Sequence, residues 1–325
     1  MRAHCCFLNA GDISGRHLAD GRGILGAIGF GTGPSVATIP GVPSATVALK
    51  RLQAGPDIEV WVSDEAVTYG TEHGIAFASS ETSLFGVVRP DTEAGDIGAV
   101  ARNAYERIFA ICAATGHPHV VRAFQYISAI TQDEDGLERY RKFNAGRSEA
   151  FAACGRSMAD APAACALGTQ AGDPVIYFLA SRDKGRAIEN PRQVSAYHYP
   201  PQYGARSPSF SRAMMIGRTL YISGTASIVG HQSRHLGDPE AQTAEILRNF
   251  DALLHEAAAC TVRDVQSSLG VKVYLRHSQD LAPVRQALSA LQPGSGTMVL
   301  QADICRRDLL VEIEAFCRLP VSSAL

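Results

Sequence analysis

The sequence predicts an α+β protein in which one α+β unit occurs twice. In each half of the 325-residue chain, patterns for a helix, a strand, a second helix and a further strand follow one another in that order. A β-hairpin pattern precedes each of these copies. A proline- and glycine-containing segment, residues 183–211, separates them. We therefore expect two fused units: residues 1–190, which include an extra N-terminal segment, and residues 191–325.

The first copy begins with hairpin strands expected at residues 58–62 and 75–88. Apolar residues then recur at helical spacing within residues 95–115, which predicts an amphipathic helix. A strand at 120–127 follows, and after it a helix at 137–154 and a strand at 175–180. In residues 1–50 we identify only a glycine-rich turn near Gly26.

The second copy repeats this order. Its hairpin is expected at residues 213–229, with a turn at 216–218. The later elements are expected at residues 244–257 (helix), 269–275 (strand), 279–291 (helix) and 298–302 (strand), the last continuing into a closing strand pattern at 309–316. When the copies are aligned, Tyr126 matches Tyr274 and Arg102 matches Arg248, which supports a distant duplication.

The closing strand carries two carboxylates in an apolar setting. Alternation would place residues 309, 311 and 313 on one face and Leu310, Glu312 and Glu314 on the other. Burial raises the pKa of a carboxyl group, and a carboxylic acid that holds its proton near neutrality can act as a general acid. The alternative is an edge strand whose glutamates face water, and the pattern alone leaves both interpretations open.

Composition limits the classes of function. The chain is 46% hydrophobic and 19% charged with a net charge of -2, so bulk charge offers no attraction to nucleic acid. No apolar run approaches the roughly 20 residues of a membrane span, and the first residues contain no secretory signal, so we expect a cytoplasmic protein. The eight cysteines form no CxxC pair and the histidines no HExxH motif. We expect neither a metal site nor a disulfide framework.

The segment at 197–212 differs from an ordinary linker. It carries three tyrosines, one phenylalanine and two arginines on a backbone stiffened by proline. Arg206 and Arg212 would lie at the crevice between the two units, where ligand sites preferentially occur. The alternative is a loop that is simply packed between two domains.

The second half resembles the YjgF/RidA superfamily in five segments: residues 220–227, 238–243, 246–250, 271–281 and 309–315. The whole chain resembles the chorismatases more narrowly, through residues 26–31, 139–147 and 199–212. This resemblance implies mixed sheets with helices packed on one face, in a pseudo-trimer-like arrangement where an interface within the chain replaces one between subunits. It also implies chorismate as substrate and no cofactor. We expect a monomer.

Chorismate is a dianion with an enol ether, so two carboxylates need cationic partners. Arginines are candidates for these partners, tyrosines for hydrogen bonds, and the turn at 224–226 for shaping the pocket. The predicted substrate-binding residues are Arg147, Arg206, Arg212, Tyr140, Tyr203, Gly224, Thr225 and Ala226.

The resemblance places the catalytic glutamate on the closing strand. We expect Glu312 to protonate the enolpyruvyl methylene, with Glu314 as the alternative acid. Cys305, seven residues earlier, has the spacing that the resemblance associates with members that form an aromatic product, and it is predicted to steer aromatisation. A small buried hydrophobic role is the alternative for Cys305.

These residues favour a chorismatase that forms 3-hydroxybenzoate and pyruvate. A hydrolytic chorismatase would give a dihydroxycyclohexadiene carboxylate and pyruvate, and a mixture of 3- and 4-hydroxybenzoate is a further alternative. A RidA-like enamine or imine deaminase would need an arginine ahead of the closing strand, and Arg306 and Arg307 are shifted by a residue from that spacing. A non-catalytic binder of aromatic acids is the remaining hypothesis.

Overall fold

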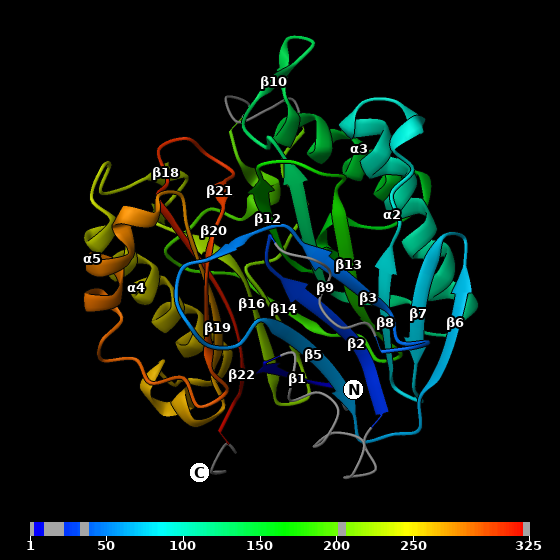
Figure 1. Cartoon of the computed structure of the whole chain (residues 1–325), viewed down its shortest axis with the longest axis horizontal. Helices are drawn as coiled ribbons and strands as arrows, with labels where there is room; N and C mark the ends of the chain where they lie inside the picture. The colour runs from blue at the N-terminus through cyan, green and yellow to red at the C-terminus, as the bar shows by residue number, and fades with distance from the viewer. Residues whose placement is uncertain (1–2, 10–22, 33–38, 201–205, 321–325) are drawn as a thin grey trace.

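The computed structural model describes residues 3–9, 23–32, 39–200 and 206–320. Two seven-stranded sheets occupy the middle of the molecule, and their helices lie on its outside (Figure 1). The first sheet has the order β21-β12-β9-β13-β8-β7-β6. Its strands are β6 (Thr68–Glu72), β7 (Ile75–Ser79), β8 (Ser83–Val88), β9 (His119–Ser128), β12 (Ala163–Thr169), β13 (Val175–Ser181) and β21 (Asp303–Ile304).

The second sheet has the order β14-β15-β16-β22-β19-β20-β4. Its strands are β4 (Lys50–Arg51), β14 (Arg186–Ile188), β15 (Ala213–Ile216), β16 (Thr219–Ala226), β19 (Gly270–Leu275), β20 (Thr297–Gln301) and β22 (Val311–Arg318). Two short hairpins complete the inventory of the two units: β10 (Asp133–Glu134) with β11 (Leu137–Glu138), and β17 (Ile228–Val229) with β18 (Gln232–Ser233).

The two sheets repeat one topology. The run β12-β9-β13-β8-β7-β6 corresponds strand by strand to β20-β19-β22-β16-β15-β14, and in both runs the first pair is parallel and the next is antiparallel. Helices occur at matching places: α2 (Ile97–Ala114) and α3 (Arg139–Ala153) in the first unit, α4 (Pro239–Ala258) and α5 (Leu281–Ala287) in the second. The predicted duplication is visible in the strand order itself.

Local sequence signals account for the helix starts. Asp96 caps α2 by accepting hydrogen bonds from the backbone N–H groups of Gly98 and Ala99. Asp238 caps α4 in the same way, and Pro239 occupies the first helical position, where its missing N–H costs nothing. Each helix pair buries its apolar side against its own sheet, which gives two outer hydrophobic cores, one for each unit.

A third sheet contains the N-terminal strands, in the order β1-β5-β2-β3. They are β1 (Ala3–Leu8), β2 (Gly23–Phe30), β3 (Ser44–Val47) and β5 (Ile58–Ser63). This corrects two expectations. Residues 58–62 do not form a hairpin with 75–88, because β5 pairs with β1 and β2. Gly26 lies within a strand rather than a turn, where a Cβ would meet the Phe85 ring at 2.0 Å.

The three sheets enclose one central core. Trp61 of β5 lies 6.1 Å from the Phe124 ring of β9 and 5.9 Å from the Tyr221 ring of β16, so each sheet contributes an aromatic side chain to one cluster. This arrangement of sheets around a shared interior agrees with the pseudo-trimer-like α+β fold expected from the sequence.

Other expectations needed correction. The strand after α3 is β12, an alanine-rich segment without β-branched residues until Thr169, so it gave no strand signal. The 175–180 strand is instead the counterpart of β22. The helix expected at 279–291 is α5, which spans only Leu281–Ala287. The division at residue 190 stays a prediction, although β14 before it already pairs within the second sheet.

Candidate active site

A cavity of about 260 Å³ lies between the two units, near the lower end of the volume range for small-ligand sites. Its walls are formed by the end of β11 with the start of α3, by the linker before β15, by β16, and by the turn before β22. The lining residues are Glu138, Tyr140, Arg141, Tyr199, Pro208, Phe210, Arg212, Gly224, Ala226, Ile228, Cys305, Arg306, Arg307, Asp308 and Glu312. A smaller hollow of about 30 Å³, lined by Arg147 and Cys165 among others, shares Glu312 with this cavity.

Glu312 lies on a central strand, not on an edge. β22 runs between β16 and β19, and Glu312 is paired with Ala226 on one side and Tyr274 on the other. The residue is only 3% exposed, so the interpretation in which it faces water is wrong. Burial and the nearby charge of Glu314 raise its pKa to about 8, against the opposing effect of Arg122. At neutral pH, Glu312 is therefore a carboxylic acid that can donate a proton.

Gly224 provides the space that Glu312 needs. The pairing of β16 with β22 is interrupted between Ile222 and Thr225, a bulge of the kind found beside active sites. A Cβ on Gly224 would lie 2.0 Å from Glu312 Oε1 and 3.0 Å from Cys165 Cβ. Any larger residue would therefore have to displace the carboxyl group.

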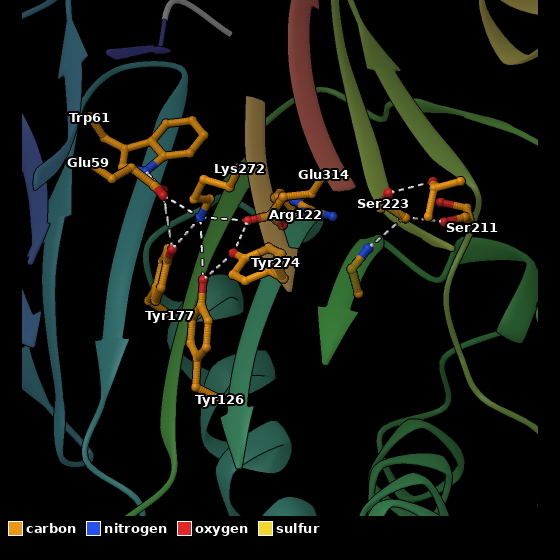
Figure 2. A network of polar contacts seen from close by, with 12 residues as sticks. Glu59, Trp61, Arg122, Tyr126, Tyr177, Ser211, Ser223, Lys272, Tyr274 and Glu314 are labelled. Carbon is orange, nitrogen blue, oxygen red and sulfur yellow. Dashed lines mark hydrogen bonds and ion pairs between the residues drawn. The ribbon is translucent and has the colours of Figure 1, made fainter. Parts of the chain in front are cut away.

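The hydroxyl of Ser223 joins the first unit to the second beside this bulge. Ser223 Oγ accepts a hydrogen bond from the Ala164 N–H of β12 (2.9 Å) and donates one to the Ser211 carbonyl oxygen (2.6 Å) (Figure 2). The residues concerned belong to β12, to the linker and to β16. This buried hydrogen-bond pair fixes the edge of the cavity at the boundary between the units.

Helix α3 directs Tyr140 and Arg147 toward Glu312. They are seven residues apart, or about two helical turns, and therefore share a face. Arg147 is 2% exposed, with Nη1 donating to Gln125 Oε1 (2.8 Å) and Nη2 to Asn144 Oδ1 (2.9 Å). Within the described part of the chain its Nε has no hydrogen-bond acceptor. A buried guanidinium with a spare donor is suited to an anionic ligand.

Arg212 is held in the cavity wall by the linker. Its Nη2 donates to the Val194 carbonyl oxygen (2.7 Å) and to the Tyr199 hydroxyl (2.8 Å), and the guanidinium stacks over the rings of Tyr199 and Phe210. Its buried Nε has no acceptor among the described residues. The aromatic residues of the linker therefore orient an arginine, which an ordinary spacer would not do.

Cys305 lies in the turn between β21 and β22 and lines both the cavity and the smaller hollow. Burial, followed by the charge of Glu312, raises its pKa to about 12. The side chain is thus a neutral thiol beside the acid. It can shape the pocket or take part in weak hydrogen bonding, but it is not a thiolate nucleophile.

The charge of the cavity lining matches a small dianion. Four arginines line it, at positions 141, 212, 306 and 307, together with the carboxyl groups of Glu138 and Asp308. Even with both of these ionised and Glu312 neutral, two positive charges remain in excess. A second cavity of about 310 Å³, beside β4 and β20, is lined by the ion pair of Arg276 with Asp303, and none of its described lining residues is a deeply buried carboxyl group.

Known proteins resemble this chain along nearly its whole length. The family model described as "Chorismatase FkbO/Hyg5-like, N-terminal" matches residues 59–180, and the model "Endoribonuclease L-PSP" matches residues 204–319. A protein of Streptomyces hygroscopicus named 3-hydroxybenzoate synthase is 35% identical, with 90% of this chain and 91% of the relative covered. The chain belongs to the chorismatase family. It is an enzyme of this type.

Further relatives support the same assignment. A chorismatase of Streptomyces rapamycinicus is 35% identical, and the match covers 96% of both chains. A crystal structure of a chorismatase superposes with a TM-score of 0.84 at 33% identity, covering 97% of this chain and 98% of that one. The shared architecture therefore includes both units and the connection between them.

Most, but not all, of the site residues predicted from the sequence line the main cavity or the adjoining hollow. Glu312, Cys305, Tyr140, Arg212, Gly224 and Ala226 line the main cavity, and Arg147 lines the adjoining hollow. Thr225 is buried and pairs with Ile313, with its hydroxyl donating to the Ser223 carbonyl oxygen (2.8 Å). Arg206 is exposed and is not among the described residues that line the cavity. Tyr203 lies outside the described residues.

Several cavity residues were not singled out as binding residues from the sequence. Arg141 lies in the same helical segment as Tyr140 and Arg147, but nothing in the spacing distinguished it. Arg306 stacks over the Tyr199 ring, with its guanidinium 5.2 Å from the ring centroid, and Nη1 donates to the His231 carbonyl oxygen (2.9 Å). The two adjacent arginines before β22 were the available signal for this side of the site.

Glu314, the alternative acid, is surrounded by cations and a hydrogen-bond donor, unlike Glu312. Its carboxylate forms ion pairs with Lys272 and Arg122 and accepts a hydrogen bond from the Tyr274 hydroxyl (2.6 Å), as Figure 2 shows. Burial alone would raise its pKa, but Lys272 and Arg122 outweigh that effect and lower the pKa to about 2. Glu314 is therefore a permanent anion near neutral pH and has no proton to donate.

The described residues contain no group of three histidine, cysteine, aspartate or glutamate side chains placed to hold a metal ion. Among the helices described, none combines the length and the apolar character needed to cross a membrane.

Proposed function

We propose that the protein is a chorismatase that converts chorismate to 3-hydroxybenzoate and pyruvate, with Glu312 as the general acid. One observation supports this most strongly: a buried carboxyl group that is neutral near pH 7 lies in the wall of a cavity lined by four arginines. Such a site combines the two requirements of an anionic enol ether, which are charge pairing for the carboxylates and a proton for the carbon.

The arginines would bind the two carboxylates of chorismate. Arg147 and Arg212 each have a buried Nε without an acceptor among the described residues, so a ligand oxygen could complete their hydrogen bonding. Arg306 and Arg141 lie in the cavity wall and add positive charge. The Tyr140 hydroxyl is positioned to hydrogen-bond a carboxylate or the ring hydroxyl, and burial raises its pKa, which keeps it neutral.

The reaction begins with a proton transfer. Glu312 gives its proton to the terminal methylene carbon of the enolpyruvyl group, a new C–H bond forms, and the positive charge that develops on the ether carbon is shared with the ether oxygen. The ionised Glu312 carboxylate then faces this cation and stabilises it electrostatically. Because the proton comes from a group whose pKa is near the working pH, the transfer is efficient in this direction.

Water determines which product follows. In the hydrolytic outcome, one water adds to the cationic carbon, and the hemiketal collapses to pyruvate and the diene diol acid. In the aromatising outcome no water is added: the ether oxygen leaves the ring as the carbonyl oxygen of pyruvate, and the neighbouring ring hydroxyl oxygen bonds to the carbon that it left while its proton returns to Glu312. The older bond of that oxygen to the ring then opens and the hydrogen on its new carbon is lost to the oxygen, so 3-hydroxybenzoate and pyruvate together contain the same atoms as chorismate. Cys305 places a neutral, weakly hydrogen-bonding side chain beside Glu312, which disfavours an ordered water there.

The alternatives are a hydrolytic chorismatase and a mixed 3- and 4-hydroxybenzoate synthase, since both begin with the same protonation. A RidA-like deaminase is the weaker candidate, although Arg306 and Arg307 do line the cavity. Residues of both units of the chain line the cavity, which supports the expectation that a monomer is active.

The test uses purified protein and chorismate. Pyruvate is followed through lactate dehydrogenase, and the ring products are separated by chromatography against authentic 3-hydroxybenzoate, 4-hydroxybenzoate and the diene diol acid. The proposal predicts equal amounts of pyruvate and 3-hydroxybenzoate. Absence of pyruvate at micromolar enzyme would reject a chorismatase of either kind. Pyruvate with only the diene diol acid would reject the aromatising assignment alone.

A further inference from the structure

Four charged side chains meet in the interior where the three sheets come together: Glu59 of β5, Arg122 of β9, Lys272 of β19 and Glu314 of β22 (Figure 2). Their side chains are between 1% and 4% exposed. We call these four residues the interior charge network. Burying so many charges costs several kcal/mol per ion unless each is paired, so their retention calls for a reason.

The contacts of the interior charge network are continuous. Lys272 Nζ is ion-paired with Glu59 and lies 2.6 Å from Glu314 Oε1. Arg122 is ion-paired with the other oxygen of Glu314. The Trp61 indole N–H donates to Glu59 Oε1 (2.6 Å), and the ammonium of Lys272 also donates to the Tyr177 hydroxyl (3.1 Å). Each carboxylate is thus fixed by at least one cation and one neutral donor.

The charges of this network balance. It contains two carboxylates and two cations, which pair without remainder. Glu312 lies two residues from Glu314 on β22, and on one face of a strand that separation is about 7 Å. Ionisation of Glu312 would therefore add a net negative charge beside a buried and already balanced set.

We propose that the interior charge network is a positioning device for the reaction: it fixes the Glu314 anion behind Glu312, so that Glu312 enters catalysis as a neutral acid. The inference depends on the proposed chorismatase function of Glu312 and deepens it. The residues of the network do not line the substrate cavity, so they act through Glu312 and not on the substrate.

Other ionisable groups also face Glu312 or its cavity, and the network acts in addition to them. The end of β11 and α3 contribute Glu138, Tyr140, Arg141 and Arg147. The strands β9, β12 and β19 contribute Arg122, Cys165 and Tyr274, respectively. The linker and the turn before β22 contribute Tyr199, Arg212, Cys305, Arg306, Arg307 and Asp308. Among these, Arg122 belongs to the network itself, where it opposes the effect of Glu314.

The test compares charge-removing variants by the pH dependence of kcat/KM for pyruvate release. A general acid is active below its pKa, so the rate falls as pH rises through that value. Glu314→Gln keeps the shape but removes the anion, which leaves an excess positive charge that Glu312 can neutralise by ionising. The falling limb should move to lower pH by about one unit or more.

Opposite changes should give opposite signs. Lys272→Met removes a cation, so the falling limb should move to higher pH. The double variant Glu314→Gln/Lys272→Met restores the balance, and its limb should return to within about 0.5 unit of the wild type. A purely structural role would lower activity or stability in all three variants without this reversal and recovery. Movement of both single variants in the same direction would overturn the proposal.

Glu59→Gln covers the case in which Glu314→Gln does not fold. Glu59 lies on a different sheet from Glu312, and its replacement by glutamine also leaves the charge of Lys272 in excess. The falling limb of the pH profile should therefore move in the same direction as in Glu314→Gln, but by less. An unchanged limb in a folded Glu59→Gln protein would then contradict the proposal. Circular dichroism and thermal unfolding establish which variants are folded.

A second readout separates this inference from the proposed function. Infrared difference spectra over a pH titration report the protonated carboxyl group of Glu312, identified by its loss in Glu312→Gln, and require no turnover. If the wild type releases no pyruvate while the carboxyl titration still moves in the network variants, the proposed function fails and the network inference survives. If pyruvate is released but neither readout moves, the network inference fails alone.

Discussion

Glu312 and Glu314 are the same residue type on one strand, two positions apart and almost equally buried, at 3% and 2% exposure. Yet the pKa of Glu312 is raised to about 8 and that of Glu314 is lowered to about 2. The difference comes from their partners. Glu314 has two ion-paired cations and a tyrosine hydroxyl, whereas no ion pair is found for Glu312 among the described residues. Burial keeps a carboxyl group protonated near neutral pH only where no cation or hydrogen-bond donor stabilises its ionised form.

The comparison also separates two uses of arginine. Arg122 pairs with a carboxylate of the protein itself and stabilises an anion in the interior. Arg147 and Arg212 are held by neutral oxygens and keep a buried Nε without an acceptor in the described chain. The Nη1 of Arg122 also lacks an acceptor among the described residues, so the difference lies in charge: that of Arg122 is paired within the protein, whereas no ion pair is found for Arg147 or Arg212 in the described chain.

The largest loss of turnover is expected when Glu312 itself is replaced. Glu312→Gln keeps the shape and removes the proton donor, so turnover should fall by at least about a hundredfold while chorismate binding persists. Pyruvate release and equilibrium binding measure the two quantities. Glu149→Gln makes the same chemical change on the exposed face of α3 and should keep full turnover. Full activity of Glu312→Gln would show that Glu312 is not the general acid.

The next largest effect is expected at Arg147, whose buried Nε has no acceptor among the described residues. Arg147→Ala removes a charged hydrogen-bond partner worth about 1.5–3 kcal/mol, so KM should rise roughly tenfold to a hundredfold with a smaller change in kcat. Steady-state kinetics with chorismate measure this. Arg147→Lys keeps the charge but loses the forked guanidinium, so its KM should lie between those of the wild type and Arg147→Ala. An unchanged KM would remove Arg147 from the binding site.

Gly224 tests how closely the acid is packed. In Gly224→Ala the new methyl would overlap Glu312 Oε1, and moving the carboxyl group should lower turnover by about tenfold. Gly31→Ala is the matched control, since a Cβ there meets nothing within 4 Å. Turnover is measured by pyruvate release at saturating chorismate. Equal rates in both variants would show that Glu312 tolerates displacement.

The smallest effect on rate, but the most specific, is expected at Cys305. Cys305→Ala opens space for water beside Glu312, so the diene diol acid should increase at the expense of 3-hydroxybenzoate, with pyruvate release within about twofold of the wild type. Chromatography of the ring products gives the ratio. Cys154→Ala, at an exposed free cysteine, should leave it unchanged. If Cys305→Ala also leaves the ratio unchanged, Cys305 is only a packing residue.

Much of this site could be predicted from the sequence because alternation and helical spacing are local. The face shared by Glu312 and Glu314 followed from a period of two. The repeated α+β unit was visible for the same reason. Tyr140 and Arg147 were named as binding residues, but their shared face on α3 was not predicted. The resemblance to chorismatases placed the catalytic glutamate on β22, where Glu312 was preferred and Glu314 was kept as the alternative.

What could not be predicted depends on contacts between distant segments. Glu59 and Lys272 are 213 positions apart, and no local pattern indicates that they form an ion pair. The same holds for Arg122 and Glu314, whose pairing adds to the effect of Lys272 in lowering the Glu314 pKa. β12 was missed because its burial, not its composition, makes it a strand.

The pH dependence of wild-type kcat/KM for pyruvate release tests the central claim most directly. Chorismate is fully ionised well below neutrality, because carboxylic acids titrate near pH 4, so a falling limb at higher pH reports the enzyme. The account predicts activity that is constant at lower pH and falls as pH rises through about 8, where Glu312 loses its proton. A rate that already falls between about pH 4 and 5, where an ordinary glutamate titrates, would contradict it.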